Sequence, residues 1–367
     1  MDSIRDVLPR TADLIAADFA AGQHKGFQLY VSLKGEVLAD AASGEAAPGV
    51  PMEPETLVCW LSSGKPLTAM AIGLLWHRSL LSLDDPVARH LPEFGRNGKG
   101  GITIRHLLAH TAGLPNVESG YPQATWEESI AAVCSAPMED GWIVGKTAGY
   151  HTASSWFMLG EVIQRVSGRP FVEFVRNEIC VPAEMADVAF ALTEGQAASY
   201  GDRVGWTWRR SGKTLEALDW HQPPRLTRAS PGSSARGPIH GLGRFYENLL
   251  AAFDGRESPF PAETVAAMTT PQRIGEFDRT FRHVVDFGLG FLVDSNRYGV
   301  DTVPYGFGRH CSPRTFGHGG SQSSIGFADP AHGLAVAWAA NAMIGEPRHQ
   351  VRNREINTAI YEDLRLA

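Results

Sequence analysis

Strand-like segments lie at both ends of the chain, and this restricts the fold more than any other feature. Near the start, residues 27–33 alternate in polarity, Lys34-Gly35 supplies a turn, and residues 37–42 return as a second strand. Near the end, Gly, Asp-Pro and Asn turns separate four further segments of this kind, 287–293, 315–318, 323–329 and 334–340. We therefore expect one antiparallel sheet assembled from the two ends.

The stretch between these segments is mostly helical by its apolar spacing, as are two segments that flank the strands. A chain of 367 residues suggests about two domains at roughly 150 residues each. We expect a discontinuous α/β (α+β) sheet domain, residues 1–60 and 286–367, and a mainly helical domain, residues 61–285. The helices are expected at 4–21, 62–79, 155–166, 171–180, 241–252 and 347–364.

Charge and apolar content exclude several classes of partner. The net charge is −7, so the whole chain has no basic footprint for nucleic acid or an anionic membrane. The longest apolar stretch, near residues 69–76, is far below the ~20 residues that a bilayer requires. Charged residues interrupt the first twenty positions, which leaves no room for the apolar core of a signal peptide. We expect a cytoplasmic protein without nucleic-acid or membrane partners, its oligomeric state open.

Common catalytic motifs are missing from the sequence. It contains no G-x-S-x-G and no H-E-x-x-H. Gly145-Lys146-Thr147 has the ending of a phosphate-binding loop, but Asp140 stands where the leading glycine belongs. Four cysteines, widely separated and without a C-x-x-C pair, indicate free thiols rather than a zinc site: Cys59, Cys134, Cys180 and Cys311. We expect no metal and no cofactor.

One short motif carries nucleophilic chemistry. Ser62-Ser63-Gly64-Lys65 is an S-x-x-K in which the first and fourth residues share one helix face. A serine at a helix N-terminus is favoured as an alkoxide, and a buried lysine has a lowered pKa and can accept a proton. The chain has only six lysines, so one at this position is notable. The spacing is typical of a nucleophile with its base one turn away.

The surroundings of this motif resemble the class C β-lactamase and penicillin-binding-protein superfamily, in particular its β-lactamase-like serine hydrolases. The resemblance implies the β-lactamase-like fold, in which an antiparallel sheet is flanked by helices and a helical region covers the active-site cleft. Six segments carry it in the family's order: WLSSGKPLTAMAIGLL, LSLDDPVARHLPEF, ITIRHLLAHTAGLP, GYHTASSWFMLGEVIQRVSGRP, SPGSSARGP and FGHGGSQSSIGFADP.

The resemblance also implies roles at the site. Tyr150 falls on the tyrosine of the family's Y-x-N motif, where it would lie beside Lys65 and relay a proton; a neighbouring ammonium would lower its pKa. The family's oxyanion hole maps to the main-chain N–H groups of Ser62 and Ser321. His318, Gly319 and Gly320 replace the K-T-G or H-x-G triplet, with glycines expected to let substrate approach the backbone.

Two departures bear on the substrate. Thr152 replaces the asparagine of Y-x-N, and His318, mostly neutral at pH 7, replaces a lysine. A β-lactam needs both groups, so we expect little β-lactamase or carboxypeptidase activity. The resemblance implies an acyl-enzyme on Ser62 in a hydrolase of small-molecule esters or amides. A transacylase with an amine or alcohol acceptor is the alternative, and a catalytically dead binding protein is a weaker one.

Other candidates are expected to be structural for the most part. His106 and His110 lie in the ITIRHLLAHTAGLP segment, where hydrogen bonding within the core is the simplest role, whereas His151 adjoins Tyr150 and could line the cleft. Loops 116–141 and 206–238 would form any acceptor site. The tryptophans that could wall an acyl pocket, although core packing suits each of them better, are Trp60, Trp156, Trp206, Trp208 and Trp220.

Overall fold

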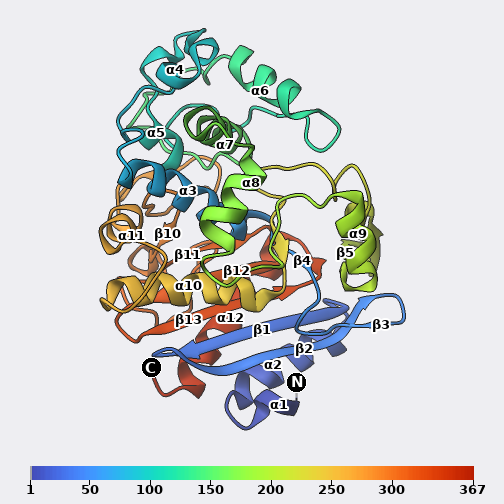
Figure 1. The fold of residues 1–367 in the computed structure, drawn as a ribbon. Helices are drawn as coiled ribbons and strands as arrows, with labels where there is room; N and C mark the ends of the chain where they lie inside the picture. The colour runs from blue at the N-terminus through green and yellow to red at the C-terminus, as the bar shows by residue number, and fades with distance from the viewer. Residues whose placement is uncertain (1) are drawn as a thin grey trace.

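The computed structural model describes residues 2–367 and contains one seven-stranded sheet drawn from both ends of the chain (Figure 1). The strand order is β10-β11-β12-β13-β1-β2-β3, and every pairing in the sheet is antiparallel. The central contact joins β1 to β13, with Leu29 opposite Trp338. The predicted sheet is thereby confirmed. Its strands are β1 Gly26–Leu33, β2 Glu36–Ala47, β3 Val50–Pro51, β10 Leu292–Val293, β11 Phe316–Gly320, β12 Ser324–Asp329 and β13 Leu334–Ala340.

Helices cover both faces of this sheet. Successive residues of a strand point to opposite faces. Phe27 and Leu29 accordingly belong to the core beneath α2 (Pro9–Ala20) and α12 (Glu346–Asp363), whereas Tyr30 belongs to the core beneath α10 (Ile239–Phe253). Figure 1 shows α10 on one side of the sheet and the two terminal helices on the other. Gly243 lets α10 approach closely, because a Cβ there would lie 2.0 Å from the Tyr30 ring.

The remaining helices form a layer above the sheet with α3 (Lys65–His77) at its centre. Every residue from Lys65 to Leu75 is buried, and α7 (Ser154–Ser167) and α11 (Ala262–Thr269) pack against this helix. No helix within residues 2–367 combines the length and the apolar character needed to cross a membrane. The other helices of this layer are α4 Val87–His90, α5 Ile104–Leu108, α6 Trp126–Ser135, α8 Phe171–Val175 and α9 Glu194–Tyr200, whereas the short α1 Asp2–Arg5 packs against α2 on the opposite face.

Short elements connect these layers. Small strands pair outside the main sheet, and short helical turns lie along the connections between the larger elements. The strands are β4 Val58–Cys59 with β7 Arg236–Gly237, β5 Thr207–Ser211 with β6 Thr214–Leu218 and β14 Ala342–Met343, and β8 Phe277–Asp278 with β9 His283–Val284. The turns are η1 Leu61–Gly64, η2 Pro92–Gly95, η3 Lys99–Gly101, η4 Arg176–Cys180, η5 Gly201–Arg203, η6 Asp219–His221 and η7 Asn296–Tyr298.

Three expected elements differ in detail. The first helix breaks before Pro9, because a proline has no N–H to continue the hydrogen-bond ladder and begins α2 instead. The nucleophile helix opens as a 3₁₀ turn, η1, before α3. Of the segment expected as a strand at 287–293, only Leu292–Val293 belongs to the sheet. The four cysteines are free thiols, as the sequence predicted.

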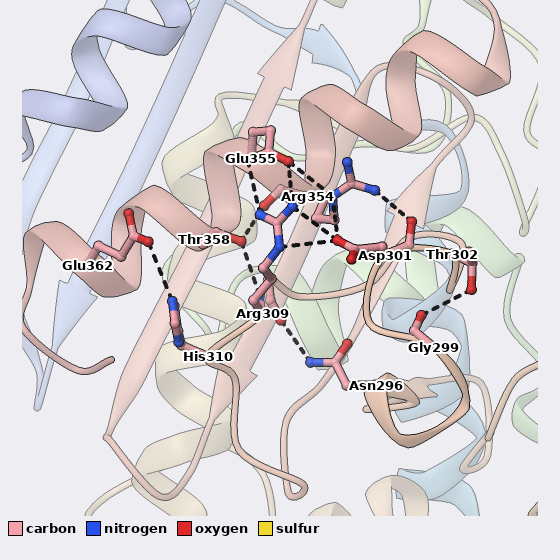
Figure 2. A network of polar contacts seen from close by, with 11 residues as sticks. Asn296, Gly299, Asp301, Thr302, Arg309, His310, Arg354, Glu355, Thr358 and Glu362 are labelled. Atoms are coloured by element: carbon pink, nitrogen blue, oxygen red, sulfur yellow. Dashed lines mark hydrogen bonds and ion pairs between the residues drawn. The ribbon is translucent and has the colours of Figure 1, made fainter.

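A polar network fastens the loop at residues 296–311 to α12 (Figure 2). Arg309 donates two hydrogen bonds to the Glu355 carboxylate, at 3.0 and 2.9 Å, and one to Asp301 at 3.2 Å. Arg354 donates to Glu355 at 3.0 Å and to the Asp301 carbonyl at 2.6 Å. This loop carries Tyr305, which lines the cavity that contains Ser62, so the network holds one wall of that cavity in place.

Candidate active site

Five of the seven residues expected to act in catalysis or to bind substrate line one cavity of about 760 Å³. They are Ser62, Tyr150, His318, Gly319 and Ser321. Lys65 lies buried directly behind Ser62, and Gly320 lies between Gly319 and Ser321 at the end of β11. The topology explains why these residues lie together. β11 is an inner strand of the sheet and packs against η1, the turn that carries Ser62.

The local backbone sets the position of Ser62. Leu61, just before it, has a left-handed φ of 51°, an uncommon conformation for a residue with a branched side chain. Ser62 then lies in the first turn of η1, where main-chain N–H groups have no helical acceptor. Ser63 fixes this turn to the sheet, because its hydroxyl lies 3.0 Å from the Ser324 hydroxyl, which donates to the Trp60 carbonyl at 2.7 Å.

The Lys65 amine has three polar neighbours, and the side chain is shielded from solvent. Its Nζ lies 3.0 Å from Ser62 Oγ, 2.9 Å from the Thr152 carbonyl oxygen and 2.6 Å from the Gly232 carbonyl oxygen. The residue is fully buried, and burial lowers its pKa well below the usual range of a lysine. The spacing predicted a lysine amine beside the serine hydroxyl, and the two groups do lie side by side.

Tyr150 is held by its main chain. Its N–H donates to Asp278 Oδ1 at 3.0 Å, and Thr280 donates to its carbonyl at 3.0 Å. Asp278 is itself fully buried and pairs with the buried Arg273 at 2.9 Å. The Lys65 amine lies 5.2 Å from the centre of the Tyr150 ring. The tyrosine is therefore fixed from behind, with its ring beside the lysine.

The pKa of Tyr150 departs from our expectation. We expected a neighbouring ammonium to lower it, but burial raises the pKa of this phenol above its usual value. The Ser62 hydroxyl opposes the rise in part, yet within residues 2–367 the Tyr150 hydroxyl has no partner at hydrogen-bond geometry. The expectation is wrong because both groups are buried: the phenol loses solvation, and a lysine with a lowered pKa has little positive charge to offer.

His318 is a neutral side chain in the floor of the cavity. It is buried in β11, and its Nδ1 lies 2.8 Å from the Gly319 carbonyl oxygen, to which it donates. Burial lowers the pKa of His318 to about 3. Its Nε2 is buried without a hydrogen-bond partner among the described residues. This position therefore offers no cation at neutral pH.

The two glycines after His318 are required by close packing within the protein. A Cβ on Gly319 would lie 2.2 Å from the Tyr305 ring, and one on Gly320 would lie 2.2 Å from both the Trp60 carbonyl and the Ser324 hydroxyl. We expected these glycines to admit substrate. Gly319 does line the cavity, but neighbouring protein atoms already exclude a side chain at both positions.

A group of residues that no local motif marks fixes the turn after Gly320. Gln322 has a left-handed φ of 55° and receives three contacts: its N–H donates to the Tyr305 hydroxyl at 3.2 Å, its carbonyl accepts from Arg352 at 2.7 Å, and its Oε1 accepts from the Gly345 N–H at 2.6 Å. Tyr305 in turn donates to the Glu346 carboxylate at 2.9 Å. These partners lie far apart in sequence, so spacing could not predict them.

The three other histidines considered in the sequence, His106, His110 and His151, are structural. His110 Nδ1 accepts from the His151 N–H at 3.0 Å, and His151 Nε2 accepts from the Leu114 N–H at 2.8 Å. His106 accepts from the Thr103 N–H at 3.1 Å at the start of α5. His151 is fully buried and does not line the cavity.

Of the five candidate tryptophans, Trp220 lies in the cavity wall. Trp60 and Trp156 are fully buried in the core, and Trp208 is buried beside β14. Trp206 stacks on His221, with ring centres 4.1 Å apart. The two loops expected around an acceptor site do contribute to the wall, through Ser119 and Tyr121 from one and Trp220, Arg225, Ser230 and Ser233 from the other.

Fold and site define a β-lactamase-like serine hydrolase: a sheet built from both ends and a helical layer enclose an S-x-x-K serine, its lysine and a tyrosine. The family profile described as "Beta-lactamase" matches residues 11–360. The chain belongs to the β-lactamase family and is an enzyme of its serine hydrolase group.

Relatives in this family include named esterases. Esterase EstB of Burkholderia gladioli is 30% identical over 372 residues, covering 93% of this chain and 89% of that protein. Esterase/beta-lactamase LipL of Mycobacterium tuberculosis is 26% identical and covers 92% and 82%. A penicillin-binding protein homologue from Caulobacter crescentus superposes with a TM-score of 0.76 at 26% identity, covering 98% of each chain. EstCE1, described as a hydrolase with promiscuous acyltransferase activity, has the same fold, with a TM-score of 0.81 at 20% identity and coverage of 98% and 100%.

Proposed function

We propose that the protein is a serine esterase that forms an acyl-enzyme on Ser62 and hydrolyses small-molecule esters. The observation that carries the proposal is the pairing of Ser62 Oγ with the buried Lys65 amine at 3.0 Å. A hydroxyl needs a base within hydrogen-bond reach to attack a carbonyl carbon. Two relatives that align with most of the chain are named esterases, which supports an ester as the substrate.

Lys65 acts as the base in its neutral form. The Thr152 and Gly232 carbonyl oxygens accept hydrogen bonds from the two N–H groups of a neutral amine. The lone pair of the amine is then left to accept the hydrogen bond of the Ser62 hydroxyl. The lowered pKa keeps the amine available for this at neutral pH. Ser62 Oγ then bonds to the ester carbon while its proton moves to Lys65 Nζ.

The developing negative charge and the leaving group need their own partners. The main-chain N–H groups of Ser62 and Ser321 donate to the oxyanion of the tetrahedral intermediate. Tyr150, whose raised pKa keeps it protonated, passes a proton to the departing alkoxide and is reprotonated through Lys65. Water repeats the sequence in reverse and releases the acid, restoring the Ser62 hydroxyl.

The first test compares the two adjacent serines. Ser62→Ala is expected to abolish both ester turnover and labelling by a fluorophosphonate. Ser63→Ala removes a hydroxyl that bonds to Ser324 and is expected to keep measurable turnover and labelling. Hydrolysis of a 4-nitrophenyl ester and intact-protein mass spectrometry give the two readouts. An active, labelled Ser62→Ala protein would refute the proposal.

Acyl transfer to an amine or alcohol is a second candidate. The cavity of about 760 Å³ has room beside a small acyl group, and loops 116–141 and 206–238 wall it. EstCE1, which shares the fold, is described as having promiscuous acyltransferase activity. Decay of the acyl-enzyme in buffer distinguishes the candidates: rapid loss favours the hydrolase, whereas a long-lived adduct that an added amine or alcohol discharges favours the transferase.

We also propose that the protein is cytoplasmic, because free cysteines are typical of a reducing compartment.

A further inference from the structure

Arg225 is a cation in the cavity wall whose side-chain nitrogens have no hydrogen-bond partner among the described residues. Within residues 2–367 its guanidinium forms no hydrogen bond and no ion pair, and its Nε is buried. Two aromatic rings hold it in place, because its guanidinium carbon lies 4.2 Å from the centre of the Trp220 ring and 4.8 Å from that of Tyr121. Stacking of this kind fixes a guanidinium plane while leaving its N–H edge free.

A second cation adds to the charge at this place. Arg236 is fully buried, and burial lowers its pKa, with Arg225 contributing in the same direction. Its side chain donates to the Trp220 carbonyl at 3.2 Å, and among the described residues no carboxylate pairs with it. Buried or half-buried charges in proteins are ordinarily paired. Two adjoining guanidiniums without a counter-charge therefore make this end of the cavity positive.

The carboxylate of the cavity wall, Glu346, forms no ion pair with Arg225 or Arg236 among residues 2–367. Glu346 accepts hydrogen bonds from Tyr305 with both of its oxygens, at 2.9 Å each. Arg282, in the wall as well, is exposed to solvent. A ligand that brought its own carboxylate would satisfy the free N–H edge of Arg225 with two parallel hydrogen bonds.

We propose that Arg225 forms a subsite for a carboxylate carried by the ester substrate, so that the enzyme prefers esters with an anionic group to matched neutral esters. The proposal rests on the proposed esterase function and specifies its substrate class. No bond to Arg225 is made or broken in the reaction; the ion pair positions the substrate, and the ester carbonyl still reacts at Ser62.

The experiment measures the ratio of kcat/KM for matched anionic and neutral esters within each variant, so that a change in the amount of folded enzyme cancels. In one arm the carboxylate is on the acyl chain, in 4-nitrophenyl monoesters of succinate, glutarate and adipate, each against its methyl-capped diester. In the other arm it is on the leaving group, in the acetate ester of 4-hydroxybenzoate against that of methyl 4-hydroxybenzoate. The two arms distinguish which part of the substrate carries the charge.

The wild-type ratio is expected to be about 10 to 100 in one arm, the range for a hydrogen bond to a charged group. Arg225→Gln should lower it to about 1. Arg225→Lys should give an intermediate value, because the charge stays while the planar fork is lost. Arg228→Gln is the matched control on the same loop: the Arg228 guanidinium already donates to the carbonyls of Pro122 and Gln123, so this ratio should not change.

Two results would overturn the inference: no anionic preference of the wild type in either arm, or a preference that Arg225→Gln retains. Should Arg225→Gln fail to fold, as judged by thermal unfolding, the Arg225→Lys ratio decides, and a wild-type value there refutes the subsite. Failure of the esterase proposal is separate, since it would appear as wild-type protein that hydrolyses none of these esters and is not labelled at Ser62.

Discussion

Burial of one lysine is the chemical basis of the site at the residue scale. Lys65 is enclosed between Ser62 and two carbonyl oxygens, and its lowered pKa suits the role of base that we propose for it. Lys65→Ala and Tyr150→Phe are each expected to lower kcat by at least ~10², the usual contribution of acid–base catalysis. The double variant should lose little more than either single one, because the two groups act as a unit. Steady-state ester hydrolysis gives all three values.

Tyr30→Phe is the control for Tyr150→Phe. It also removes a buried hydroxyl that has no partner at hydrogen-bond geometry among residues 2–367. This hydroxyl lies on β1 beneath α10, away from the cavity, so kcat should stay close to wild type. Near-wild-type turnover by Tyr150→Phe would rule out the proton relay. If the double variant lost kcat by the product of the two single losses, Lys65 and Tyr150 would not act as a unit.

At the scale of elements, one buried ion pair joins the segment around β8 to the site. Asp278 accepts from the Tyr150 N–H and pairs with Arg273 in the core. Asp278→Asn should destabilise the fold by about 3–5 kcal/mol, because it leaves the Arg273 charge buried without a partner. The same change at Asp254, whose pair with Arg256 is half exposed, should cost no more than about 1 kcal/mol. Urea unfolding measures both, and equal stabilities would refute a structural role for the buried pair.

The same elements show what the sequence could predict. Period-two alternation located β1 and β2. The ordered motifs singled out Ser62 and Tyr150, which line one cavity, and Lys65, which lies buried behind Ser62. The pKa of Tyr150 was predicted in the wrong direction, because it depends on burial that spacing cannot reveal. Arg225 and Tyr305 were missed for a related reason. Tyr121, one of the two rings that hold Arg225, and Glu346, which bonds to Tyr305, lie far away in sequence, and no short motif surrounds Arg225 or Tyr305.

At the scale of the whole molecule, buried neutral histidines make stability depend on pH. Burial lowers the pKa of His151 and His318 to about 3 and that of His24 to about 4. An unfolded histidine binds a proton near pH 6.5. The unfolded state therefore binds more protons between pH 6.5 and about 3, and stability falls as the pH falls through that window, by at most about 1.4 kcal/mol per pH unit for each histidine.

The free energy of unfolding in urea at pH 7 and at pH 5 checks this dependence. Carboxylates with lowered pKa values titrate below this interval and contribute little to the difference. Burial raises the pKa values of Asp18 and Asp294, and these two carboxyl groups act in the opposite direction to the histidines. His24→Gln removes one such histidine away from the cavity and should reduce the difference between the two pH values by about one histidine's share. Equal unfolding free energies at the two pH values would contradict the burial of these side chains as neutral groups.

The central claim, a covalent acyl-enzyme on Ser62, is tested most directly by locating the acyl group after a single turnover. The protein is mixed with a 4-nitrophenyl ester, quenched in acid and digested with trypsin. Because Pro66 follows Lys65, cleavage leaves Ser62 within the peptide at residues 35–78, which also contains Ser43 and Ser63. Fragmentation of that peptide by electron transfer is predicted to place the acyl mass on Ser62. An acyl group on another residue, with Ser62 unmodified while turnover proceeds, would contradict the account.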